Sequence, residues 1–210
     1  MNTQILDSKR IAKNTLMLYV RMLFTMIVSL FATRIVLDTL GASDYGIYNL
    51  VGGVVGLMGT VTSLLSQGTT RFITISLGKN DSDLLKSTFL SSLTIHILFA
   101  ILILIVGESI GPWVIGKLNI PIERLGAARF VFQFSLITSL FNIVQAPFNA
   151  CIIAHERMNI YAYISIWEAV AKLLIVYMLV ISEVDKLKLY SFLYFMVGII
   201  TAIIYYLYCT

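Results

Sequence analysis

Long apolar runs dominate the chain, and short polar stretches separate them. A membrane-spanning helix needs about 20 mainly apolar residues to cross the hydrocarbon core. Runs of about that length lie at residues 15–37, 45–72, 88–106, 127–153, 159–181 and 189–208. Residues 97–106 are apolar at every position, which is not the alternation of a barrel strand. The pattern therefore predicts an all-α membrane protein, with residues 1–210 forming a single transmembrane bundle of about six helices.

The stretches between the runs predict how the helices are joined. Residues 38–44 contain Gly41 and predict a tight connection between the first two helices. Residues 107–124 contain Pro112 and several polar residues, which predicts an elbow lying at the membrane interface. Pro147 falls inside the fourth run and predicts a kink in that helix.

The composition favours a membrane protein over a soluble one. Of the 210 residues, 59% are hydrophobic and only 12% are charged, and the mean hydropathy is +0.90. Soluble domains carry about 25% charged residues. The net charge of +4 comes from basic residues near the ends of the apolar runs. There they set orientation and meet anionic lipid, so the bilayer rather than nucleic acid is the expected partner.

The basic residues give a weak indication of orientation. Lys9, Arg10 and Lys13 cluster before the first run. With the N-terminus inside, seven basic residues, these three included, lie on the cytoplasmic side and six on the other side. Because short basic segments tend to stay in the cytoplasm, we expect the N-terminus to be cytoplasmic.

Small and polar residues form stripes along four of the six predicted helices, at spacings of three and four that place them on one face. The stripes comprise Arg21, Thr25 and Ser29; Asn49, Gly53, Gly56, Thr60, Ser63, Gln67 and Thr70; Thr138, Asn142, Gln145 and Asn149; and Tyr161, Ser165, Glu168 and Lys172. They predict a bundle around a polar or hydrated interior. The candidate lumen residues are Asn49, Thr60, Gln67, Asn142, Gln145 and Asn149. Alternatively, the small residues only allow close helix packing, as a GxxxG pair at Gly52 and Gly56 would.

Glu168 and Lys172 lie one helical turn apart near the middle of the fifth run. A single charge at the bilayer centre costs about 3 kcal/mol on insertion scales, so the two residues must pair or face the interior. Such a pair could exchange a proton or another cation, or it could bind an anionic substrate at the lysine. It could also be a permanent ion pair that only fixes the orientation of the helix.

Arg21 and Arg34 are basic residues within the first run. Arg21 lies deeper, and its guanidinium could recognise phosphate, whereas Arg34 could also extend to the interface. Together with Glu168 and Lys172 they are the candidate substrate-binding or ion-coupling residues. His96 is the ionisable side chain of the third run, and we expect it to hydrogen-bond a neighbouring helix.

The chain shows no motif of an enzyme or a metal site. Cys151 and Cys209 are far apart, and no CxxC or Cys/His cluster is present. Neither a P-loop nor a nucleophile elbow occurs. We therefore expect no catalytic residue, no bound metal and no cofactor.

Short motifs near the first turn resemble those of a known transporter superfamily. Residues 13–15 (KNT) resemble the basic-Asn-Ser/Thr start of bacterial polysaccharide flippases, and residues 40–46 (LGASDYG) resemble their LG-x-x-(D/E)-YG link. Residues 67–71 and 147–157 also fit. The chain is similar over nearly its whole length to the O-antigen and polysaccharide branch of the multidrug/oligosaccharidyl-lipid/polysaccharide exporter superfamily.

This resemblance implies a function in lipopolysaccharide or polysaccharide biosynthesis. Such flippases move anionic, undecaprenyl-type lipid-linked glycans across the bacterial inner membrane by alternating access, coupled to a proton or sodium ion. They have two six-helix lobes, so the chain would be the first lobe alone, as a fragment or a truncated product. Its partners would be a second six-helix lobe or glycan polymerisation machinery. Within this resemblance, Arg21, Arg34 and Lys172 are candidates for the cationic lining that the branch uses to bind pyrophosphate-linked glycans.

Two other functions remain open. A multidrug cation antiporter of the same superfamily would favour an interior lined by acidic residues, and Glu168 is the mid-span carboxylate available for it. A truncated remnant that does not transport is the other alternative.

Overall fold

The computed structural model describes the backbone of residues 2–209, in which helices are joined by short turns and no strand occurs; side chains are described for residues 12–57 and 59–209. The helices are α1 (Asn2–Gly78), α2 (Ser82–Lys117), the 3-10 helix η1 (Ile122–Arg124), α3 (Leu125–Ala154), α4 (Met158–Ile181) and α5 (Lys186–Cys209). Five helical stretches in this part of the chain are long and apolar enough to cross a membrane. The predicted all-α membrane bundle is confirmed.

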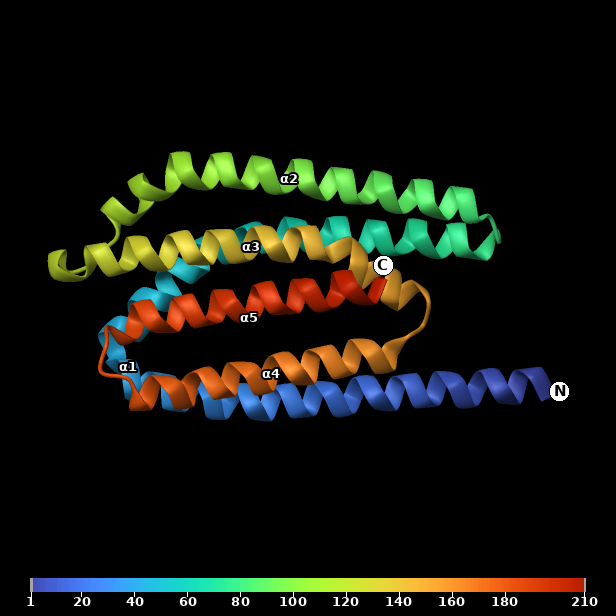
Figure 1. Ribbon diagram of the computed structural model, residues 1–210, viewed down its shortest axis with the longest axis horizontal. Coiled ribbons are helices and arrows are strands. Elements are labelled where there is room, and N and C mark those ends of the chain that lie inside the picture. The colour runs from blue at the N-terminus through green and yellow to red at the C-terminus, as the bar shows by residue number, and fades with distance from the viewer. Residues whose placement is uncertain (1, 210) are drawn as a thin grey trace.

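The helix α1 contains the first two predicted spans, and it turns back on itself at Gly41 (Figure 1). Gly41 has φ 78° and ψ 164°, a region of backbone conformation that essentially only glycine adopts. The residues on both sides of it are helical. The predicted connection at residues 38–44 is thus reduced to one non-helical residue, and α1 consists of a first segment, residues 2–40, and a second segment, residues 42–78.

Figure 1 shows how the helices are arranged around α3. The helix α3 contacts α1, α2 and α5, while α4 contacts α1 and α5. The first segment of α1 runs beside α4, and α2 lies on the opposite side of the bundle. Because the chain crosses the bundle back and forth, its N-terminal and C-terminal ends lie at the same end of the molecule.

The elbow predicted for residues 107–124 was wrong over most of its length. The helix α2 continues through Pro112 to Lys117, and only residues 118–121 and η1 connect it to α3. A proline inside a helix removes one backbone donor, which membrane helices tolerate where neighbouring groups compensate.

The glycines of this stretch pack α2 against α3. A Cβ on Gly107 would lie 2.7 Å from a methyl carbon of Leu136, and a Cβ on Gly111 would lie 2.1 Å from the ring of Phe132. The two glycines are one turn apart, and the two α3 side chains occupy the space that they leave. Leu136 and Phe132 are both buried, so this contact belongs to the core of the bundle.

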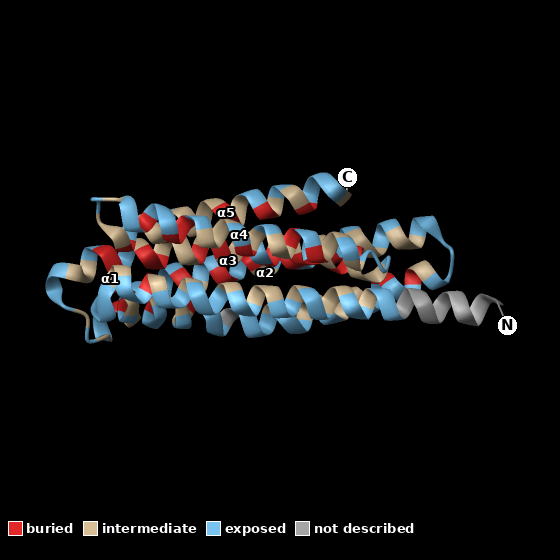
Figure 2. Cartoon of the chain, turned by 90° about the horizontal axis from the view of Figure 1, so that it is seen from below, coloured by how far each residue is buried: buried red, intermediate tan, exposed pale blue. Residues whose placement is uncertain are grey.

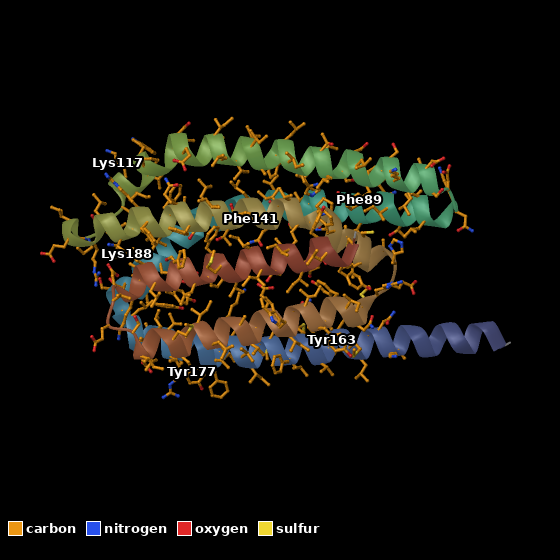
Figure 3. All side chains as sticks on the ribbon, viewed as in Figure 1. Phe89, Lys117, Phe141, Tyr163, Tyr177 and Lys188 are labelled. Atoms are coloured by element: carbon orange, nitrogen blue, oxygen red, sulfur yellow. The ribbon has the colours of Figure 1, made fainter. Side chains whose placement is uncertain are left out.

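The outer surface of the bundle is apolar, as a lipid environment requires. Buried residues line the interior, and exposed residues cover the outside (Figure 2). Large apolar side chains such as Leu57, Trp113 and Tyr163 are exposed. On α4, Tyr163 and Tyr177 extend away from the bundle (Figure 3). A surface of this kind is stable against hydrocarbon but not in water.

Candidate functional site

Two cavities lie within the bundle, and Tyr48 and Tyr194 line both of them. The first cavity, of about 550 Å³, is the charged cavity, because Arg21, Glu168 and Lys172 lie in its wall. The second, of about 520 Å³, is the neutral cavity, because its wall of described residues contains no Asp, Glu, Lys, Arg or His. The two cavities therefore form adjacent compartments whose walls differ in chemistry.

Residues of α1 and α5 contribute to both walls, whereas α4 contributes only to the charged cavity and α3 only to the neutral cavity. The other polar residues lining the charged cavity come from α1, α4 and α5: Thr25, Ser29, Thr33, Tyr45, Asn49, Tyr161, Ser165 and Tyr190. The polar and small residues lining the neutral cavity come from the second segment of α1, from α3 and from α5: Gly52, Gly56, Gly59, Thr62, Ser63, Ser66, Ser135, Thr138, Ser139, Asn142, Ala146 and Ser191.

Glu168 and Lys172 form an ion pair within α4. The Lys172 Nζ donates to Glu168 Oε1 at 2.6 Å, and it also lies 4.7 Å from the centroid of the Tyr194 ring. About a third of each charged side chain is exposed, and both line the charged cavity. The pair thus faces the interior of the bundle, where the aromatic ring further stabilises the ammonium.

Arg21 is satisfied less completely than Lys172. Its guanidinium carbon lies 4.4 Å from the centroid of the Tyr161 ring, and its Nη1 donates a long hydrogen bond of 3.3 Å to Ser165 Oγ. The Arg21 Nε is buried without a hydrogen-bond partner. Among the described side chains, no carboxylate forms an ion pair with Arg21.

The charge of the cavity follows from these contacts. Two cationic side chains and one carboxylate line it, which leaves an excess of one positive charge. Since Lys172 already has Glu168 as its partner, the uncompensated cation is Arg21. A guanidinium with free donors in a polar cavity is suited to bind an anion such as phosphate.

The other candidate residues from the sequence are dispersed. Asn49 lines the charged cavity, where its amide donates to the Tyr45 carbonyl oxygen at 2.8 Å, and Asn142 lines the neutral cavity. Neither cavity is lined by the remaining candidates, which are Arg34, Thr60, Gln67, Gln145 and Asn149. Arg34, Thr60 and Gln67 are exposed, whereas Gln145 Oε1 and Asn149 Oδ1 are buried without a partner.

The close packing suggested for Gly52 and Gly56 is wrong in this structure. A Cβ on either residue would meet no atom within 4 Å, and both line the neutral cavity.

Within the described part of the chain, His96 does not form the hydrogen bond to a neighbouring helix that the sequence predicted. His96 is buried, and its Nδ1 lies 2.8 Å from the carbonyl oxygen of Ser92, one turn earlier in its own helix.

A group of tyrosines between the two cavities was missed by the sequence reasoning. The rings of Tyr48 and Tyr190 are 4.8 Å apart, and those of Tyr190 and Tyr194 are 6.1 Å apart. Tyr190 and Tyr194 are one turn apart on α5, a spacing visible in the sequence. Because tyrosine is also frequent at membrane interfaces, that spacing alone does not indicate a cavity.

The role of Arg124 was also missed. Its guanidinium pairs with Asp44 at 2.9 Å and with Asp185 at 3.4 Å, and Lys188 lies 3.6 Å from the same Asp185 carboxylate. Asp44 belongs to the LGASDYG motif just after Gly41, and Asp185 to the turn before α5. Arg124 therefore joins three connections at one end of the bundle, the end where Lys117 and Lys188 lie in Figure 3.

A helical bundle that crosses a membrane repeatedly and encloses polar cavities is typical of a membrane transporter. A family model described as MatE matches residues 18–178, more than three quarters of the chain. The chain belongs to the MatE family of the multidrug/oligosaccharidyl-lipid/polysaccharide exporter superfamily, and it carries an exporter-type transport domain. Members of this family are transporters rather than enzymes. No curated protein and no solved structure matches the chain significantly.

Proposed function

We propose that the chain is the substrate-binding lobe of a flippase that moves an anionic, lipid-linked glycan across a bacterial inner membrane. The observation that supports this most directly is Arg21, a partly buried guanidinium in a cavity, with a free Nε donor and no ion pair among the described side chains. A diphosphate would supply both the missing acceptors and the missing negative charge.

The wall around Arg21 fits the same class of substrate. Lys172 lies in the same cavity and could contact an anion while it stays bonded to Glu168. The ammonium has three donors, and Glu168 accepts one of them. A second cation in the same cavity adds to the attraction for a doubly charged group.

The second candidate, a multidrug cation antiporter, is less well supported. A cationic substrate needs a carboxylate that is free to accept it. Glu168 is the carboxylate that lines the charged cavity, and its Oε1 lies 2.6 Å from Lys172 Nζ. Binding a cationic drug there would require that pair to break, with the lysine left unpaired inside the bilayer.

The resemblance to two-lobed exporters supports the remaining parts of the proposal. A second six-helix lobe would cover the exposed polar residues Thr60 and Gln67 and would complete the alternating-access pathway. A proton or sodium ion would drive the cycle. The N-terminus would lie in the cytoplasm.

The substitution Arg21→Gln tests the proposed site. With the protein in lipid nanodiscs, binding of a polyprenyl diphosphate is expected to weaken by roughly tenfold to a hundredfold, since a hydrogen bond to a charged group contributes about 1.5–3 kcal/mol. The matched control is Arg34→Gln on the same helix, which lies outside both cavities and should bind the lipid like the wild type. Equal affinities of the Arg21→Gln variant and the wild type would disprove the assignment, and so would equal losses in both variants.

A further inference from the structure

Apart from Tyr48 and Tyr194, the residues that line the neutral cavity do not line the charged cavity. Hydroxyl groups from three helices face the neutral cavity, together with the amide of Asn142 and the rings of Tyr48 and Tyr194. Its volume of about 520 Å³ is too large for a single ion. It falls within the range of small-molecule sites, roughly 300–1,000 Å³.

Several hydroxyls of the neutral cavity have already used their hydrogen. Thr138 Oγ1 donates to the carbonyl oxygen of Phe134 at 2.7 Å, and Ser139 Oγ donates to that of Leu136 at 2.8 Å. Ser191 on α5 is bonded in the same way to its own helix, at 2.9 Å. Each of these oxygens keeps free lone pairs and presents an acceptor to the space within the cavity, while the Asn142 amide in the same wall offers both donors and an acceptor.

The lining of the neutral cavity suits one part of a lipid-linked glycan better than the others. An ionised phosphate carries negative charge and has only acceptors, so a wall without a cation does not favour it. A prenyl chain would leave the polar wall unsatisfied. Uncharged sugar residues present O–H donors to the serine and threonine oxygens, and their C–H faces can pack on the tyrosine rings.

The two cavities are adjacent, because Tyr48 and Tyr194 line both of them. Tyr194 contacts the Lys172 ammonium on the charged side. In a lipid-linked glycan the first sugar is bonded directly to the diphosphate. A ligand whose diphosphate lies beside Arg21 and Lys172 therefore has its sugar residues close to the tyrosines that separate the compartments.

We infer that the neutral cavity is a second subsite, which binds the uncharged sugar residues of the substrate while the charged cavity binds its diphosphate. The inference rests on the proposed function and extends it to the substrate class. The preferred substrate is a glycan with neutral sugars next to the diphosphate, and the tyrosines form the boundary between the two subsites.

The test compares two probes on the full chain in nanodiscs. One probe is a polyprenyl diphosphate, and the other is the same lipid carrying a neutral hexose trisaccharide. The quantity of interest is the sugar increment, the ratio of the two dissociation constants measured on one variant. We expect the wild type to bind the sugar-bearing lipid at least tenfold more tightly than the bare lipid.

Substitutions of two glycines on one helix separate the subsites. Gly56→Leu places a bulky side chain in the neutral cavity. Gly53→Leu is the control, because Gly53 lines neither cavity; neither position has an atom within 4 Å of an added Cβ. In Gly56→Leu the sugar increment should fall to about one while the bare lipid binds as before. Asn142→Leu alters the same cavity from α3 and should lower the sugar increment in the same way. The test therefore still works if one of the two variants fails to fold.

The outcomes distinguish this inference from the proposed function. Arg21→Gln should weaken binding of both probes by the same factor and leave the sugar increment intact. If the bare lipid binds equally to the wild type and to Arg21→Gln, the proposed diphosphate site is wrong. If the wild type shows no sugar increment, or if the increment survives in Gly56→Leu and Asn142→Leu, the sugar subsite is wrong. Equal loss of the increment in Gly53→Leu and Gly56→Leu would also overturn it.

Discussion

The two cations of the charged cavity differ in how their charge is compensated. Lys172 has a carboxylate partner at 2.6 Å and an aromatic ring, whereas Arg21 has one long hydrogen bond to a neutral oxygen and an aromatic ring. A charge without a partner at this depth is costly unless water or a ligand reaches it. The residue that is worst satisfied by the protein itself is thus the best anchor for an anion.

Removing the carboxylate should make the cavity more strongly cationic. In Glu168→Gln, Lys172 loses its charged partner, and the excess positive charge of the cavity rises from one to two. We expect the affinity for polyprenyl diphosphate to increase about tenfold, the equivalent of about 1.4 kcal/mol.

The matched control for this prediction is Glu108→Gln on α2. Glu108 is exposed, accepts a hydrogen bond from Gln133 at 3.1 Å and lines neither cavity, so its removal should leave the affinity unchanged. Weaker binding in Glu168→Gln would show that the carboxylate orients Lys172 for the ligand rather than competing with it.

The sequence could indicate some of these residues and not others. Arg21, Glu168 and Lys172 stood out because a charge within an apolar run is energetically expensive and must face a polar environment. Arg34 could not be separated from them, since its distance from the interface is not visible in the sequence. Tyr48 was missed, because an aromatic residue in an apolar run looks the same whether it meets lipid, the core or a cavity.

At the scale of helices, small residues have two different functions in this bundle. Gly107 and Gly111 allow α3 side chains to approach the α2 backbone, whereas Gly52, Gly56 and Gly59 leave space that becomes the neutral cavity. Both sets contain the same i, i+4 spacing. Only the three-dimensional structure shows beside which glycines a neighbouring side chain occupies the space that a Cβ would take.

Alanine at these two kinds of site should have opposite effects on stability. In Gly111→Ala the new methyl would lie 2.1 Å from the Phe132 ring, and overpacking of this kind costs about 1–3 kcal/mol. In Gly59→Ala the methyl enters open space, and the better helix propensity of alanine stabilises the helix by up to about 1 kcal/mol. Thermal unfolding of the two variants in the same detergent measures the difference, and a Gly111→Ala variant as stable as Gly59→Ala would refute the close contact.

The hydropathy of the sequence predicted the membrane-spanning helices more accurately than the segments that connect them. The helices α3, α4 and α5 begin and end within a few residues of the predicted runs. The elbow was misassigned because Pro112 looks like a helix breaker, although α2 continues through it. The ion pair of Asp44 with Arg124 joins residues far apart in the sequence, so spacing could not reveal it.

At the scale of the whole molecule, the Gly41 turn determines how often the chain crosses the membrane. If α1 turns back at Gly41, both chain ends and the turns after α1 and α3 lie on one side (Figure 1). The Gly41 turn, the connection between α2 and α3, and the turn between α4 and α5 then lie on the other side. This arrangement requires six crossings, with α1 providing two.

Labelling of single cysteines tests this arrangement, in a background where Cys151 and Cys209 are replaced by serine. With the N-terminus cytoplasmic, Ala42→Cys, Asn119→Cys and Glu183→Cys should react with a membrane-impermeant maleimide in intact cells. Asn80→Cys and Glu156→Cys should react only after permeabilisation. If Ala42→Cys resists the reagent under both conditions, α1 does not turn back at Gly41.

The brevity of the Gly41 turn has a mechanical consequence for the two compartments. A single residue keeps the adjoining ends of the first and second segments of α1 together, so a displacement of one end moves the other with it. The first segment contributes Arg21 to one compartment, and the second contributes Gly56 to the other. We therefore expect the compartments to change shape in step, so that a headgroup and its attached sugars are released together rather than one after the other.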